Sequence, residues 1–178
     1  MSKPLNDRRI LIVATDGFEQ SELKVPQQQL AELGATVHVA SPKPGSIKGW
    51  DKKDWGDAVT VDLPLSEARV ADYDALVLPG GQMNPDALRL EAAAITLIQD
   101  FAQAGKPVAA VCHAPWLLID AGLVRGRRVT SWPSLRTDLS NAGGIVVDES
   151  VVEDDGVITS RKPEDLDDFV AKIAAALS

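Results

Sequence analysis

Residues 105–115 of the chain read GKPVAAVCHAP. The four apolar residues Val108–Val111 have the length of a buried strand, and they lead directly into Cys112 and His113. Pro115 suits the first turn of a following helix, because a residue at that position has no intrahelical N–H bond to lose. A strand that passes at once into a helix is the repeating unit of a parallel sheet. The stretch therefore predicts an α/β fold with a cysteine at a strand-to-helix turn.

The same alternation of strands and helices extends over the chain. Apolar runs of strand length occur at residues 9–14, 36–40, 75–78, 129–131, 145–147 and 157–159. Helical periodicity is found at residues 19–33, 91–104, 113–121 and 163–177, and Pro26 is expected to kink or restart the first of these helices. The pattern predicts a doubly wound α/β sandwich, in which a mostly parallel sheet carries helices on both faces.

Residues 41–73 interrupt this alternation with several glycines and prolines and a dense group of charges. We expect a small hairpin excursion from the main sheet there, with residues 47–50 and 58–61 as its arms. The sequence contains no linker, internal repeat or low-complexity tract. Residues 1–178 are therefore expected to form a single domain.

The composition narrows the classes of partner. The 178 residues carry a formal net charge of −8 without a clustered basic patch, which disfavours a nucleic-acid partner. No apolar run has the length of a membrane span, and the polar residues before the first strand do not resemble a secretory signal. Cys112 is the single cysteine, so an internal disulfide and a cysteine metal cluster are excluded. We therefore expect a protein of the reducing cytoplasm without a membrane segment.

Three groups of residues that could carry chemistry follow predicted strands, at 16–19, 79–86 and 112–113. Ligands of an open α/β sheet bind outside the carboxyl ends of its strands, so these residues are expected to converge on one crevice. Cys112 has the small residues Ala110 and Ala114 two positions before and after it, as a nucleophile at a tight strand-to-helix turn requires.

Cys112 is either a reactive thiol or an ordinary core residue. The start of a helix favours a thiolate through its free N–H groups and its dipole, so we expect a pKa below that of a free cysteine. His113 follows directly and could activate the thiol, as in other Cys–His pairs. His38, the other histidine, lies within a predicted strand and is interpreted as structural.

Three further residues are candidates for the site. A protonated Glu19 could donate a hydrogen bond to the thiolate; alternatively it is a charge partner of the helix N-terminus, a task for which Glu22 is also available. The N–H groups of Gly81, in a Pro-Gly-Gly turn, and of His113 could form an oxyanion hole. Asp86 lies five residues beyond Gly81 and also suits a helix start.

Together these motifs resemble the PfpI intracellular protease/amidase family, within the class I glutamine amidotransferase-like superfamily that includes the Parkinsonism-associated stress protein. The matching stretches span nearly the whole chain in the family's order. They are DGFEQSEL at 16–23, ALVLPGG at 75–81, GKPVAAVCHAP at 105–115, TSWP at 130–133, NAG at 141–143 and SRKP at 160–163.

The resemblance implies a flavodoxin-like sandwich in which Cys112 is the nucleophile and Glu19 is its protonated partner. It implies that His113 pairs with an acid from a neighbouring subunit, so the protein is expected to be a homodimer or a higher homo-oligomer. Asp86 matches the position of that acid, where the family usually has glutamate. No metal or organic cofactor is implied. Members of the family are described as peptidases, as stress proteins that remove glyoxal and methylglyoxal adducts, and as enzymes that convert methylglyoxal to lactate.

Two classes of function follow. In the first, the protein is a cysteine hydrolase that acts on small dicarbonyl or glycated substrates, as a deglycase or glyoxalase III-like enzyme, or on peptides. In the second, it is a non-catalytic stress protein that senses oxidants through a readily oxidised Cys112. His113 and Asp86 distinguish the two classes, because only the hydrolase requires them.

Overall fold

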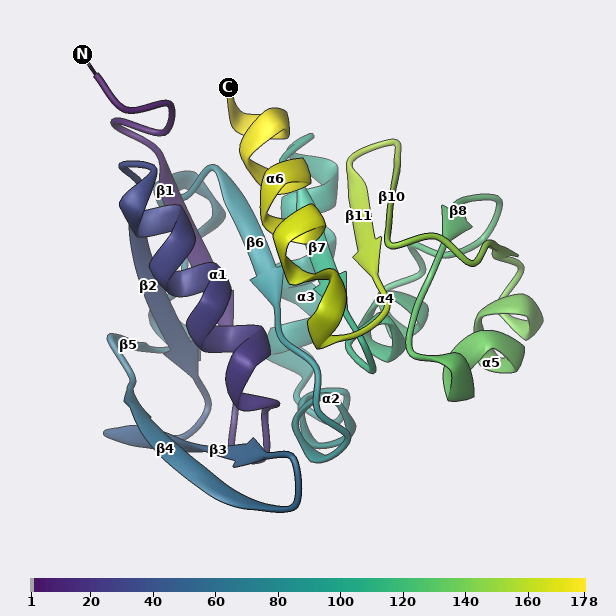
Figure 1. Cartoon of the computed structure of the whole chain (residues 1–178), viewed down its shortest axis with the longest axis horizontal. Coiled ribbons are helices and arrows are strands. Elements are labelled where there is room, and N and C mark those ends of the chain that lie inside the picture. The colour runs from purple at the N-terminus through teal and green to yellow at the C-terminus, as the bar shows by residue number, and fades with distance from the viewer. Residues whose placement is uncertain (1) are drawn as a thin grey trace.

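The computed structural model describes residues 2–178 and contains a central seven-stranded sheet between two layers of helices (Figure 1). Its strands are β1 (Arg9–Val13), β2 (Thr36–Ser41), β5 (Leu63–Pro64), β6 (Ala75–Leu78), β7 (Val108–Val111), β10 (Val151–Asp154) and β11 (Val157–Ser160). They lie in the order β10-β11-β7-β6-β1-β2-β5. Only β10 runs antiparallel to its neighbour β11, and the other neighbouring pairs are parallel.

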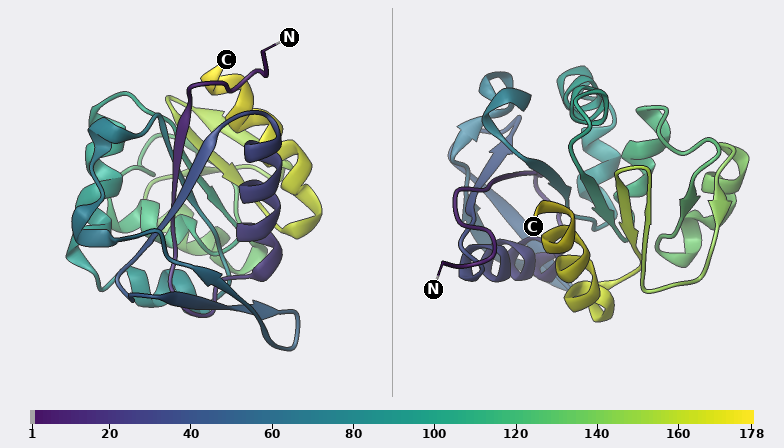
Figure 2. Two further views of the ribbon diagram at one scale, coloured as in Figure 1. Left: turned by 90° about the vertical axis from the view of Figure 1, so that its left-hand side faces the viewer. Right: turned by 90° about the horizontal axis from the view of Figure 1, so that it is seen from above.

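The helices cover both faces of this sheet (Figures 1 and 2). One face carries α1 (Gln20–Glu32) and α6 (Leu166–Leu177), and the other carries α2 (Met83–Leu88), α3 (Ala92–Gln103) and α4 (Pro115–Asp120). A short helix α5 (Arg136–Asn141) lies beside a separate parallel pair, β8 (Arg128–Val129) and β9 (Ile145–Val146). Four single-turn 3-10 helices span Leu65–Glu67, Val70–Asp72, Pro133–Leu135 and Pro163–Asp165. The predicted doubly wound sandwich is confirmed.

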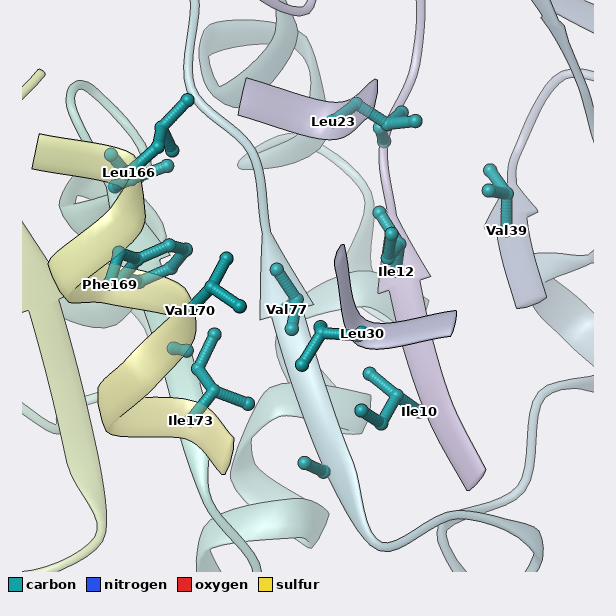
Figure 3. Packing of buried hydrophobic residues seen from close by; sticks show 14 of the residues in the cluster. Ile10, Ile12, Leu23, Leu30, Val39, Val77, Leu166, Phe169, Val170 and Ile173 are labelled. Atoms are coloured by element: carbon teal, nitrogen blue, oxygen red, sulfur yellow. The ribbon is translucent and has the colours of Figure 1, made fainter. Parts of the chain in front are cut away.

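Two apolar layers hold the helices to the sheet. Successive strand residues point to opposite faces, so a strand covered on both sides is apolar throughout, as β6 and β7 are. On one face, side chains of α1 and α6 pack on β1 and β6 (Figure 3). The fully buried members of that layer include Ile10, Ile12, Leu23, Leu30, Val77, Phe169 and Ile173. The opposite layer includes Leu11, Leu76, Leu78, Phe101, Leu117 and Leu118.

A hairpin of β3 (Ser46–Asp51) and β4 (Asp54–Thr60) projects from the sheet beside the first turn of α1 (Figure 1). The Trp50 N–H donates to the Phe18 carbonyl at 2.7 Å, and the Gly17 N–H donates to the Lys48 carbonyl at 2.8 Å. These bonds fix the hairpin to the loop between β1 and α1. The expected excursion is confirmed, with arms longer than predicted, and its tip lies near the carboxyl ends of the strands.

The structure differs from the sequence expectation at several elements, and β5, α2 and α5 are among those not expected. Helix α1 runs through Pro26 without interruption, because its buried residues Leu23, Pro26 and Leu30 pack on the sheet. Strand β10 has no counterpart in the sequence expectation. It pairs with β11 through a turn at Asp155 and Gly156, whose φ values are 48° and 80°. An Asp-Gly pair with this backbone favours a two-residue hairpin turn, which joins β10 to β11.

Candidate active site

The carboxyl ends of β1, β6 and β7 meet at one cleft of about 660 Å³. The loop after β1 supplies Glu19, the turn after β6 supplies Gly81, and the turn after β7 supplies Cys112 and His113. The expected convergence is confirmed. Further lining residues come from α1, the hairpin, the segment after β8 and the segment before α6; they include Glu22, Lys24, Val25, Trp50, Asp51, Lys52, Trp132, Pro163 and Glu164.

Cys112 lies at a sharp turn between β7 and α4. Its φ of 63° is in the left-handed region, which is unfavourable for a residue with a side chain. Two backbone bonds fix this conformation: the Cys112 N–H donates to the Ser160 carbonyl at 3.0 Å, and the Trp132 N–H donates to the Cys112 carbonyl at 2.9 Å. The side chain is 6% exposed and faces the cleft. This conformation agrees with the predicted nucleophile turn.

The carboxyl group beside the thiol belongs to Glu22. This residue is fully buried in the first turn of α1, and its Oε1 accepts the Gly80 N–H at 3.0 Å. The carboxyl lies beside Cys112 across Gly80, and its Oε2 has no hydrogen-bond partner among the described residues. The expectation that Glu19 occupies this position is wrong. Glu19 precedes the helix in extended conformation and lines the cleft instead.

Gly80 allows the three segments to approach one another. A Cβ atom at this position would lie 2.5 Å from Glu22 Oε1, 2.7 Å from the Val111 carbonyl oxygen and 2.8 Å from Cys112 Cβ. Real Cβ atoms do not tolerate such contacts, and two of these neighbours cannot move without displacing the thiol or its carboxyl partner. Only glycine therefore permits the Glu22–Cys112 contact at this site.

Burial raises the pKa of both groups of this pair. It raises the pKa of Glu22 to about 8, so the carboxyl keeps its proton at neutral pH. Burial also raises the pKa of the Cys112 thiol, and so does the charge of an ionised Glu22, whereas the N–H groups of Gly81 and His113 lower it. The expectation of a lowered thiol pKa is therefore not supported, because the helix start is outweighed by burial. A protonated Glu22 removes the repulsion and can donate its O–H to the sulfur.

His113 lies against the thiol, with its Nδ1 3.2 Å from Cys112 Sγ. The ring stacks on Trp132 with centroids 5.9 Å apart, and Trp116 meets its edge at 5.2 Å. Burial lowers the pKa of His113, so the imidazole is neutral at pH 7 and can accept a proton. The two side chains are therefore in contact, although adjacent residues of a chain usually project in different directions.

The N–H groups of Gly81 and His113 lie close enough to the Cys112 sulfur to lower the pKa of the thiol. They belong to different strand ends, and each is fixed by its own turn. An oxygen that develops charge next to the sulfur would lie within reach of the same two donors. The arrangement fits the predicted oxyanion hole.

Asp86 is exposed on α2 and does not line the cleft. No hydrogen bond joins it to His113 within the described chain. The other histidine, His38, makes a 2.8 Å hydrogen bond from Nδ1 to the Tyr73 hydroxyl, away from the cleft. Within residues 2–178, no group of three His, Cys, Asp or Glu side chains is arranged to hold a metal ion. No helix in the same range is long and apolar enough to cross a membrane.

The profile of the DJ-1/PfpI family matches residues 8–176. The chain belongs to this family. A DJ-1/PfpI relative in Pyrococcus abyssi, named a deglycase, is 45% identical over 158 residues, which are 89% of this chain and 92% of the relative. A protein of Thermococcus kodakarensis, also named a deglycase, is 42% identical over the same shares of the two chains. The crystal structure of Drosophila melanogaster DJ-1beta matches with a TM-score of 0.86 and 30% identity, covering 96% of this chain and 91% of that one.

The protonation of Glu22 can be tested by the direction in which Glu22→Gln changes the thiol pKa. If Glu22 donates a hydrogen bond from a neutral carboxyl, the amide is a weaker donor and the pKa of Cys112 rises, by about 1 unit. If Glu22 is ionised, the amide removes a repulsive charge and the pKa falls. The rate at which iodoacetamide alkylates Cys112, measured as a function of pH, gives the pKa of the thiol in each variant.

Glu19→Gln is the matched control for this experiment. It removes a carboxyl three residues away on the same segment, which lines the cleft without a hydrogen bond to the thiol. We expect less than half of the change that Glu22→Gln produces. A fall in the thiol pKa of Glu22→Gln would contradict the assignment of a neutral carboxyl.

Proposed function

We propose that this protein is a cofactor-independent cysteine hydrolase that removes glyoxal and methylglyoxal adducts from amines and thiols in the cytoplasm. The observation that carries the proposal is the 3.2 Å contact between His113 Nδ1 and Cys112 Sγ at a strained strand-to-helix turn. The contact lies in a cleft of about 660 Å³, which has room for a small adduct on a side chain. The deglycase names of the archaeal relatives support this substrate class.

The first step joins the adduct to the enzyme. An adduct of methylglyoxal on an amine has one carbon that bears both a hydroxyl group and the amine nitrogen. His113 takes the thiol proton, and Sγ of Cys112 forms a bond to this carbon. The carbon–nitrogen bond breaks, and the amine leaves with the proton that His113 held. The repaired amine departs, and a hemithioacetal remains on Cys112.

The second step releases the bound fragment. The hydrogen on the sulfur-bearing carbon moves as a proton to the neighbouring carbonyl carbon, which converts the hemithioacetal into a thioester of a 2-hydroxy acid. The oxidation of one carbon is matched by the reduction of the next, so no external oxidant is consumed. Water then cleaves the thioester, which releases the hydroxy acid and restores the thiol. Gly81 and His113 N–H groups stabilise the oxyanions of both steps.

Substitutions of Cys112 and His113 should distinguish a hydrolase from a protein that only senses oxidants. Cys112→Ser should reduce the rate of methylglyoxal-adduct hydrolysis at least 1,000-fold, and His113→Ala should reduce it by about 100-fold or more, because the sulfur loses its base. The rates are measured as lactate and free amine released from an isolated adduct in chelator-treated buffer. Cys112→Ser purified in the same way is the control for contaminating glyoxalases. Full activity of His113→Ala would exclude the proposed proton transfer and favour a sensing role.

We propose further that Asp86 reaches His113 of a second subunit in a homodimer or higher oligomer. Asp86 is exposed on α2 and lies outside the cleft of its own chain, and the imidazole nitrogen opposite Nδ1 needs an acceptor to hold the tautomer. His113→Ala and Asp86→Ala should each be inactive alone, and their mixture should recover activity. After free exchange about a quarter of the sites hold all their groups. Full activity of Asp86→Ala by itself would contradict the shared site.

A further inference from the structure

The mouth of the cleft carries three carboxyl groups that the reaction steps do not use. They are Glu19, Asp51 at the end of β3, and Glu164 in the turn before α6. Asp51 and Glu164 are exposed, whereas Glu19 is half-buried. The Glu19 N–H donates to the Gly80 carbonyl at 3.3 Å, beside the turn whose next N–H group, that of Gly81, lowers the pKa of the thiol. Glu19 is therefore held next to the reacting centre without contacting the thiol.

Glu19 lies where its negative charge is poorly stabilised. Burial raises the pKa of Glu19, and the charge of Asp51 raises it further. The N–H and the ammonium of Lys52 act in the opposite direction but do not outweigh these two causes. A carboxylate in this situation gains from a cation brought into the cleft, because the cation replaces the solvation that the carboxylate has lost.

The lysines of the cleft leave this charge incompletely neutralised. Lys24 lines the cleft, but its ammonium forms a 2.5 Å salt bridge with Asp57, a residue of β4 that lies outside the cleft. Lys52 occupies the hairpin tip and is exposed. Three carboxylates thus face one ammonium that has no salt-bridge partner of its own among the described residues.

Two indole rings complete the wall. Trp132 is 37% exposed, and it stacks on His113 while lining the cleft. Trp50, on the hairpin, also lines the cleft, and its backbone pairs with that of Glu19. Aromatic faces beside carboxylates are the surroundings that guanidinium and ammonium groups prefer, because the ring quadrupole and the carboxylate attract the same charge.

We propose that the cleft selects cationic substrates, with Glu19 as a specificity-determining residue. The inference rests on the proposed function and narrows it: adducts on guanidino groups, which stay positively charged, are preferred to neutral adducts on thiols and to anionic adducts. Glu19 and Asp51 attract the cation, the two indole rings flank it, and the adduct carbon is thereby carried towards Cys112 Sγ.

The charge preference can be measured with Cys112 itself as the reporter. Two methanethiosulfonates of similar size, one ending in trimethylammonium and one in sulfonate, each transfer their alkylthio group to the thiol and release methanesulfinate. The ratio of the cationic to the anionic rate reports the potential in the cleft. We expect Glu19→Gln to lower this ratio about threefold to tenfold, and Glu19→Asp to restore most of it.

Asp100→Asn is the matched control, because it removes one exposed carboxylate from α3, behind the sheet (Figure 1). Its ratio should stay within about 1.5-fold of the wild-type value, as expected for a screened distant charge. Equal ratios in wild type and Glu19→Gln would overturn the proposal. A ratio that falls equally in Asp100→Asn would overturn it too, since the effect would then reflect net charge.

Substrate turnover separates this inference from the proposed function. With methylglyoxal adducts of Nα-acetylarginine amide and Nα-acetylcysteine amide, Glu19→Gln should raise KM several-fold for the arginine adduct and leave the cysteine adduct unchanged. Equal effects on both adducts would overturn the specificity role. The wild type could hydrolyse neither adduct while Glu19→Gln still lowers the ratio of the cationic to the anionic methanethiosulfonate rate. In that case the proposed function fails, whereas the charge preference of the cleft is supported.

Discussion

The contact between the Glu22 carboxyl and the Cys112 thiol requires three separate segments to meet without an intervening side chain. Gly80 has no Cβ atom to separate these segments, and its N–H donates a hydrogen bond to Glu22 Oε1. Cys112 adopts a left-handed backbone conformation at the turn that follows β7. The parallel order β7-β6-β1 places the three segments side by side at one edge of the sheet. Much of the fold around the cleft can be understood as maintaining this contact.

Environment gives two acids on one segment different tasks. Glu22 is sealed between α1 and the sheet, where burial keeps it protonated and makes it a donor. Glu19, three residues earlier, reaches the cleft and faces the hairpin, where a charged carboxylate can act on a ligand. The hairpin matters to both the packing and the chemistry, because it closes the cleft on the side of Glu19 and brings a second acid, Asp51, to the same mouth.

The sheet and the thiol were predictable because their signals are local. Apolar runs mark β6, which Pro79 follows, and β7, which Pro107 precedes, and the small residues around Cys112 mark the turn. The choice between Glu19 and Glu22 depends on helix phase, which a boundary error of one residue changes. A usable signal was present: Glu22 lies four residues before Pro26 and eight before Leu30, and all three are buried on one face of α1. Burial sets the pKa values of Glu22 and Cys112. It arises from segments that are distant in the chain, so no local stretch of sequence indicates it.

The chemistry of the cleft depends most on the proton that Glu22 carries at neutral pH, and infrared difference spectroscopy between wild type and Glu22→Gln observes this proton directly. The wild-type spectrum should contain the carbonyl stretch of a protonated carboxylic acid at neutral pH. That band should give way to carboxylate bands as the pH rises through about 8. Carboxylate bands alone at neutral pH would contradict the account, because an ionised Glu22 would oppose the thiolate that the chemistry requires.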